Sequence, residues 1–153
     1  MRFIANIIDK LQRHPKRIVF PEGTEPRVLQ AARQFQSLRL GAPILLGERD
    51  KIKALANEMQ ISMEGIHTIN PIESEDLDNF ARRFASLRRF KGLKEPEARE
   101  AILQPNYFGA MMLAMHQADG LVSGTSHTTG SVLRPLFQIV KMAPQTITAS
   151  STA

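Results

Sequence analysis

The sequence predicts a three-layer α/β protein, in which an open and mostly parallel sheet carries helices on both faces. Short apolar runs alternate with longer segments of helical periodicity, as in consecutive βαβ units. The apolar runs are continuous, which is typical of strands that are covered on both sides. The 153 residues correspond to one domain by length.

The first half of the chain alternates helices and strands. Pro15 ends a first helix over residues 2–13, because its ring disfavours helical geometry at the residue before it. Thr24 is the expected N-cap of the second helix, and Gly41 its expected left-handed C-cap. We expect strands over residues 17–20, 43–46 and 66–69, and a third helix over residues 48–59.

The second half begins with a helix that Ser74 is expected to cap, running to Phe90 and stopped by Gly92. A helix over 95–103 follows, and then one from Asn106 whose apolar residues lie on almost all sides, so it should be buried. The remaining expected elements are a strand over 120–123, a helix over 132–142 and a strand beginning at 146–149. No helix follows to cover that last strand, so we expect the fold to be incomplete and the chain to be a piece of a larger protein.

Composition excludes several classes of function. Without cysteine there is no disulfide scaffold, zinc–cysteine site or thiol nucleophile, and the four scattered histidines predict no metal site. The net charge of +5 is modest, and with 6% aromatic residues the chain has few rings that could stack on bases. No nucleic-acid partner is therefore expected. The sequence shows no apolar stretch of about eighteen residues and no signal peptide. We therefore expect a cytoplasmic protein with no membrane partner.

Residues 118–135 contain the highest concentration of candidate ligand-binding side chains. A strand there is expected to run into a loop rich in Gly, Ser and Thr and then into a helix. Ligands of open parallel sheets bind outside the carboxyl ends of the strands. A helix start attracts phosphate, and the planar guanidinium of Arg134 suits phosphate oxygens. The candidate binding side chains in the loop are Ser126, His127, Thr128, Thr129 and Ser131. The alternative is a loop whose hydroxyls only cap the next helix.

Several segments, spread in order along the whole chain, resemble the phosphate acetyl/butyryltransferase family. They are KRIVFPEGTEPRVLQAA, PILLG with the KIKALA helix after it, LRRFKG, NYFGAMM, and ADGLVSG…HTTG…LRPLFQIVK. Members of the family are much longer, so the resemblance covers their N-terminal half. It implies that residues 1–153 are the N-terminal part of a family domain whose second half is absent here.

The resemblance also implies a fold and a reaction. The fold would be two α/β domains, similar to the isocitrate dehydrogenase group, with the site in the cleft between them and a homodimer in the full-length form. The reaction would exchange acetyl-CoA and phosphate for CoA and acetyl phosphate, by direct attack of the CoA thiolate on the acetyl phosphate carbonyl. Coenzyme A or acetyl-CoA would then be a substrate, with no permanently bound cofactor and no metal.

Two arginines match arginines of the family's cleft. Arg88 in LRRFKG matches one implicated in CoA binding, although a solvated cation at a helix end is the alternative. Arg134 in VLRP matches the second. The family's proposed catalytic aspartate lies in the second half, so no catalytic residue is assigned here and the chain alone is expected to be inactive. Phosphate butyryltransferase, a catalytically inactive phosphate- or CoA-binding module, and a malic-enzyme domain are the alternatives.

Overall fold

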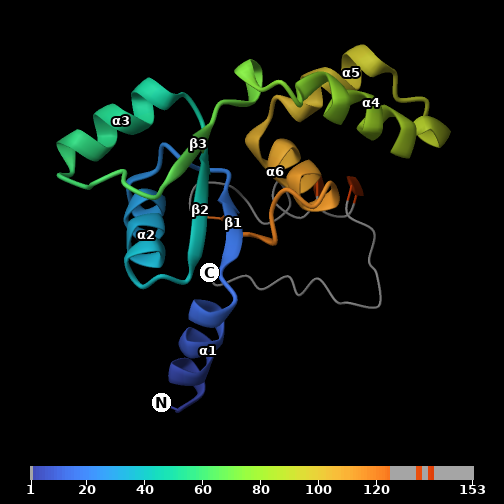
Figure 1. The fold of residues 1–153 in the computed structure, drawn as a ribbon. Coiled ribbons are helices and arrows are strands. Elements are labelled where there is room, and N and C mark those ends of the chain that lie inside the picture. The colour runs from blue at the N-terminus through green and yellow to red at the C-terminus, as the bar shows by residue number, and fades with distance from the viewer. Residues whose placement is uncertain (1, 125–133, 136–137, 140–153) are drawn as a thin grey trace.

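A parallel sheet of four strands forms the centre of the computed structural model, which describes residues 2–124, 134–135 and 138–139 (Figure 1). Its strands are β1 (Lys16–Phe20), β2 (Gly41–Leu46), β3 (His67–Ile69) and β4 (Gly120–Leu121), in the order β3-β2-β1-β4. Within the register, Ile18 of β1 lies opposite Pro43 of β2 on one side and Gly120 of β4 on the other. The chain therefore builds the sheet outward from β1 in one direction and then returns to add β4 on the other side.

Two helices, α2 (Pro26–Ser37) and α3 (Arg49–Glu58), cover one face of the sheet. Phe20 packs edge-on against Phe35, with ring centroids 6.4 Å apart. The buried cluster on this side consists of Phe20, Val28, Leu29, Ala32, Leu45, Ile52, Ala56 and Ile66. Strand residues of alternating parity face opposite sides, so Val19 and Ile44 belong to the other cluster.

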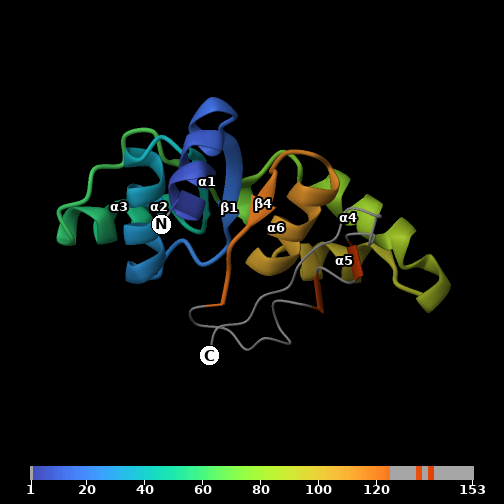
Figure 2. The same cartoon turned by 90° about the horizontal axis from the view of Figure 1, so that it is seen from below.

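Helices α4 (Leu77–Leu87), α5 (Glu95–Ile102) and α6 (Pro105–Ala114) lie on the other side of the sheet, as the view from below shows (Figure 2). α6 is buried on nearly all sides, as its composition predicts. A side chain at Gly109 would come within 2.9 Å of the Leu121 side chain, so glycine lets α6 approach β4 closely. The Phe108 ring of α6 packs against the Phe80 ring of α4, with ring centroids 5.0 Å apart. Helices on both faces of a parallel sheet confirm the predicted three-layer fold class.

The first helix, α1 (Arg2–Arg13), extends away from the start of β1 (Figure 1). Its apolar residues are on the surface of the described chain: Phe3 is 75% exposed and Ile4 53% exposed. The Gln12 side chain donates a hydrogen bond of 2.8 Å to the Leu38 carbonyl. None of the helices in the described ranges is long and apolar enough to cross a membrane.

Two expectations about α2 are wrong. The residue before the helix is Glu25 rather than Thr24, and it makes no capping hydrogen bond with its side chain. The helix ends at Ser37, and Arg39, not Gly41, adopts the left-handed conformation with φ of 58°. Gly41 instead begins β2, where an added Cβ would lie 1.9 Å from the Lys16 carbonyl oxygen. Glycine is needed there by the close approach of two strands.

The expected helix from Ser74 to Phe90 is divided into two parts, α4 and then a 3-10 turn, η2 (Arg89–Lys91). Another 3-10 turn, η1 (Pro71–Glu73), lies just before the expected start. The Ser74 hydroxyl accepts the Asp76 backbone N–H at 3.1 Å, so it stabilises the turn before α4 rather than capping the helix. Gly92, with φ of 75°, ends the segment as predicted. The expected strand at 146–149 and most of the expected helix at 132–142 lie outside the described residues.

Candidate functional site

The carboxyl ends of β1 and β4 form the point where the strand order changes direction. Connections leave neighbouring strands toward opposite faces at such a point, which opens the crevice where open α/β sheets bind ligands. Pro21 and Glu22 follow β1 at this end of the sheet, and Ser123 and Gly124 follow β4 at the same end. The loop rich in Gly, Ser and Thr begins immediately after Gly124.

Four residues form a polar group at this edge, which we call the switch-point cluster: Glu22, Asn106, Ser123 and Gly124. The carboxylate oxygen Oε1 of Glu22 accepts the Gly124 backbone N–H at 2.7 Å and the Ser123 hydroxyl at 3.1 Å. Ser123 Oγ also lies 3.1 Å from Asn106 Oδ1, in the first turn of α6. Glu22 is only 5% exposed and Asn106 8% exposed. The cluster thus joins the ends of two strands and the start of a helix.

Hydrogen bonding explains how a carboxylate is accommodated at Glu22. A buried charge is costly unless it is paired or hydrogen bonded, and a bond from N–H to a carboxylate is among the stronger ones. Ser123 has a single hydroxyl proton, which it can donate to Glu22 or to Asn106 but not to both. If the Asn106 amide is rotated by half a turn, its N–H group can donate to Ser123 Oγ while the Ser123 hydroxyl donates to Glu22.

Arg88 is half-buried and follows the last residue of α4. Its guanidinium carbon lies 5.4 Å from the centre of the Phe90 ring, and Lys91 Nζ lies 5.7 Å from the same ring. Phe90 is 75% exposed, so two cations and an aromatic face lie together on the surface at η2. This surface has the chemistry to attract an anionic ligand that also carries a planar ring.

Arg134 is exposed and lines a shallow hollow with Ala101, Gln104, Tyr107 and Pro135. The segment that carries it is attached to α6, because the Tyr107 hydroxyl donates to Gln138 Oε1 at 3.0 Å. Ile139, with 3% exposure, belongs to the core on this side of the sheet. Arg134 is therefore placed beside α5 and α6, after the loop that begins at the switch point.

The predicted site residues have different surroundings. Arg88 contacts the Phe90 ring, while Arg134 lines the hollow beside Tyr107. Ser126, His127, Thr128, Thr129 and Ser131 lie outside the described residues. Their roles, and those of both arginines, remain predictions.

Sequence reasoning missed the switch-point cluster. One signal was available: Glu22 directly follows a predicted strand, at the edge where ligands bind. Its burial depends on partners about a hundred positions away and has no local signature. Within the described ranges, no group of three histidine, aspartate or glutamate side chains is arranged to hold a metal ion.

Comparison with known proteins decides the family. The family model described as phosphate acetyl/butaryl transferase matches residues 2–153. The chain belongs to the phosphate acetyl/butaryl transferase family. The family resemblance seen in the sequence is thereby confirmed.

Two relatives show how much of this family's length the chain represents. It is 44% identical over 144 residues to the phosphate acetyltransferase of Thermoanaerobacterium thermosaccharolyticum, covering 94% of this chain and 43% of the relative. It is 38% identical over 151 residues to that of Acetivibrio thermocellus, covering 99% and 45%. The chain thus spans less than half the length of the curated relatives that it matches.

Solved structures of the family have the same architecture. The EutD phosphotransacetylase from Staphylococcus aureus superposes with a TM-score of 0.82 at 36% identity, covering 94% of this chain and 44% of that one. A phosphotransacetylase from Streptococcus pyogenes gives a TM-score of 0.82 at 33% identity, covering 90% and 43%. The three-layer fold described here is therefore that of the corresponding part of these family members.

Proposed function

We propose that this chain forms the substrate-binding part of a phosphate acetyltransferase, which converts acetyl-CoA and phosphate to CoA and acetyl phosphate. The observation that carries the proposal is the switch point at the carboxyl ends of β1 and β4, where Ser123 and Gly124 bond to Glu22 and after which the Gly/Ser/Thr loop and Arg134 follow in the sequence. Family membership and the names of the relatives support acetyl transfer over other uses of this fold. Coenzyme A and acetyl-CoA enter as substrates, and no permanently bound cofactor is proposed.

In the direction of acetyl-CoA synthesis, the CoA sulfur attacks the carbonyl carbon of acetyl phosphate. A carbon–sulfur bond forms, the bond from that carbon to the bridging phosphate oxygen breaks, and phosphate leaves with the electron pair. The guanidinium of Arg134 offers parallel N–H donors to the phosphate oxygens, and the hydroxyls of Ser126, Thr128, Thr129 and Ser131 and the ring of His127 add donors from the loop. Arg88 is proposed to bind an anionic group of CoA.

The residue that receives the thiol proton is proposed to lie outside these 153 residues. The chain corresponds to 43–45% of its relatives, and turnover needs the reacting groups held together by both walls of the cleft. Residues 1–153 are accordingly proposed as the N-terminal part of the family domain, binding substrates without turnover. The longer protein is proposed to be a cytoplasmic homodimer.

The test is to purify residues 1–153 and measure binding and turnover separately. Isothermal titration with CoA and with inorganic phosphate should show saturable binding, while acetyl-CoA formation from CoA and acetyl phosphate should not exceed the rate without protein. If the chain binds neither CoA nor phosphate, the proposed substrate-binding role is wrong. Turnover at an ordinary enzymatic rate would reject the proposed inactivity of the piece. Butyryl phosphate, tested as a competitor of acetyl phosphate, addresses the butyryl alternative.

A further inference from the structure

Two phenylalanines of the described residues are strongly exposed: Phe3 on α1 and Phe90 in η2, each at 75%. Single exposed apolar residues are common on proteins and need no function. Phe90, however, has two cations at its ring. The guanidinium carbon of Arg88 lies 5.4 Å from the ring centre, and Lys91 Nζ lies 5.7 Å from it, both within the range of cation–π contacts.

The backbone of η2 holds Phe90 at the surface. The N–H groups of Lys91 and Gly92 close the turn, each with a hydrogen bond of 2.9 Å to a carbonyl three positions earlier. Leu93, directly after the turn, packs against the buried cluster on the side of α4, α5 and α6. A Cβ added at Gly92 would have no atom within 4 Å, so the described chain leaves the space beside that position open. The ring is therefore presented on an anchored turn, and contact with a ligand needs no rearrangement of the backbone.

The charge around this ring is positive. Residues 88–94 include four basic residues and no acidic one. An aromatic side chain binds a planar base by stacking, and neighbouring Arg and Lys side chains bind the phosphates that such a base carries in a nucleotide. The surface at η2 thus has the chemistry of a nucleotide site. CoA, a proposed substrate, has a nucleotide at one end: adenosine with a 3′-phosphate and a 5′-pyrophosphate.

The position of η2 relative to Arg134 fits the shape of CoA. α4 and α5 lie side by side, with η2 between them in the chain, so η2 lies near the start of α5 (Figures 1 and 2). The hollow that contains Arg134 is lined by Ala101 and Gln104, at the other end of α5. An eight-residue helix is about 12 Å long. CoA carries its adenine and its thiol at opposite ends, and its pantetheine arm is long enough to span this separation.

We propose that Phe90 stacks on the adenine ring of CoA, with Arg88 and Lys91 beside the phosphates of the same nucleotide. This role rests on the proposed function, in which CoA is a substrate, and it adds a residue that recognises the base. The thiol end of CoA then extends toward Arg134. Phe90 contacts none of the reacting atoms, so its contribution is to the affinity for CoA.

The experiment divides CoA into its two ends. Isothermal titration of the 153-residue chain measures the Kd for CoA, for adenosine 3′,5′-bisphosphate and for 4′-phosphopantetheine. Phe90→Ala removes the ring, Phe90→Leu keeps an apolar side chain without a ring, and Phe90→Tyr keeps the ring. Phe3→Ala and Phe3→Leu are matched controls, because Phe3 is equally exposed but lies on α1. The midpoint of thermal unfolding, followed by circular dichroism, should be unaffected in the Phe90 variants because the side chain is exposed.

In Phe90→Ala we expect the Kd for CoA and for adenosine 3′,5′-bisphosphate to rise about tenfold, as for loss of one base–aromatic stack. Phe90→Leu should behave like Phe90→Ala, and Phe90→Tyr should stay within about twofold of the unchanged chain, since a tyrosine ring also stacks. The Kd for 4′-phosphopantetheine should stay within about twofold in every Phe90 variant. Both Phe3 variants should leave all three affinities within about twofold.

Four results would overturn the role of Phe90. Equal behaviour of the Phe90 and Phe3 variants would make Phe90 an ordinary exposed side chain. Full affinity in Phe90→Leu would exclude stacking, and an equal loss of 4′-phosphopantetheine binding would place the contact elsewhere on CoA. Binding of CoA without binding of adenosine 3′,5′-bisphosphate would exclude a nucleotide site. In each of these cases the unchanged chain still binds CoA, whereas a chain that binds neither CoA nor phosphate refutes the proposed function as well.

Discussion

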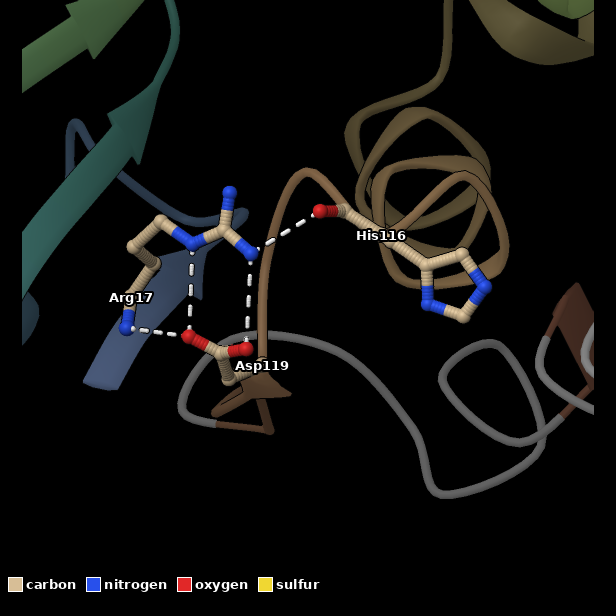
Figure 3. Close-up of polar contacts among 3 residues, drawn as sticks. All are labelled: Arg17, His116 and Asp119. Carbon is tan, nitrogen blue, oxygen red and sulfur yellow. Dashed lines mark hydrogen bonds and ion pairs between the residues drawn. The ribbon is translucent and has the colours of Figure 1, made fainter. Parts of the chain in front are cut away.

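The side chains of Arg17 and Asp119 connect the start of β1 to the start of β4 (Figure 3). This contact lies at the amino ends of the two strands, whereas the switch-point cluster lies at their carboxyl ends. Asp119 Oδ2 accepts the Arg17 backbone N–H at 2.8 Å and Nε at 3.3 Å. Arg17 Nη2 also donates to the His116 carbonyl oxygen at 2.8 Å, and the Asp119 backbone N–H donates to the Arg17 carbonyl at 2.7 Å. Because β4 has only two residues, these contacts add to the few backbone hydrogen bonds that hold it beside β1.

Asp119→Asn should lower the free energy of unfolding by about 1 kcal/mol at pH 7, the upper range for partly exposed ion pairs. The neutral amide keeps an acceptor for the Arg17 backbone N–H but loses the ion pair. Urea denaturation followed by circular dichroism measures the change. Asp78→Asn is the control, because its pair with Arg99 lies on a more exposed surface and should change the free energy of unfolding by roughly 0.5 kcal/mol or less.

The same pair makes stability depend on pH. Hydrogen bonds from the Arg17 side chain and backbone hold the pKa of Asp119 below its ordinary value of 3.8. A carboxylate whose pKa is lower in the folded state stabilises that state fully above its unfolded pKa, and this contribution disappears as pH falls through the folded pKa. The difference between the unchanged chain and Asp119→Asn should therefore be full at pH 7 and shrink below about pH 4. A constant difference from pH 7 to pH 3 would contradict this role for Asp119.

Gly41→Ala should destabilise the protein by about 1–3 kcal/mol, the usual range for forced overpacking. An added Cβ would lie 1.9 Å from the Lys16 carbonyl oxygen, so β1 and β2 would have to separate at this end. Gly92→Ala is the comparison, since a Cβ added at Gly92 would have no atom within 4 Å. Only the positive φ of 75° makes a side chain unfavourable at this position. It should cost about 1 kcal/mol. Equal losses of unfolding free energy in the two variants would rule out the close approach of strands as the reason for Gly41.

Arg88→Ala should raise the Kd for CoA about tenfold and leave the Kd for inorganic phosphate nearly unchanged. The expected cause is loss of a charge-assisted contact beside the Phe90 ring. Arg89→Ala, which removes a neighbouring exposed cation, is the matched control and should have little effect. Isothermal titration measures both ligands. If the two variants behave alike, Arg88 is only a solvated cation at the end of a helix.

Arg134→Lys should weaken phosphate binding although it preserves the charge, because lysine lacks the planar fork that pairs with phosphate oxygens. We expect a loss of about 1–3 kcal/mol in Arg134→Ala and a substantial part of it in Arg134→Lys. Arg83→Ala, on the exposed side of α4, serves as the control. NMR titration with inorganic phosphate and with CoA measures the effect. Affinities that do not change for either ligand in Arg134→Ala would remove Arg134 from the site.

The apolar surface of α1 should promote association of the 153-residue chain without contributing to its core. Phe3 and Ile4 are 75% and 53% exposed in the described chain. With both replaced by serine, the chain should remain monomeric up to a higher concentration. Its free energy of unfolding should stay within about 0.5 kcal/mol of that of the unchanged chain. Sedimentation velocity measures association, and urea denaturation measures stability. A loss above this range would mean that these side chains pack in the folded state.

The fold class could be predicted because its determinants are local. A short apolar run such as residues 43–46 and the helical spacing of Ile52 and Ala56 are properties of neighbouring residues, and all of these became buried as expected. Errors arose where a contact distant in sequence decided the role of a residue. Gly41 looks like a helix cap because it follows a helix, yet its role depends on the Lys16 carbonyl.

One part of the candidate site could likewise be predicted from the sequence, and another part could not. Arg134 and the Gly/Ser/Thr loop could be singled out from the sequence because their residue types and order suit phosphate. Family membership followed from short motifs that keep their order along the chain. Glu22 could not be assigned from sequence, because a charged residue after a strand is most often solvated. Tertiary structure alone decided its contacts: the parallel order β2-β1-β4 brings Glu22 to Ser123 and Gly124, and a carboxylate buried there needs the hydrogen bonds that they donate.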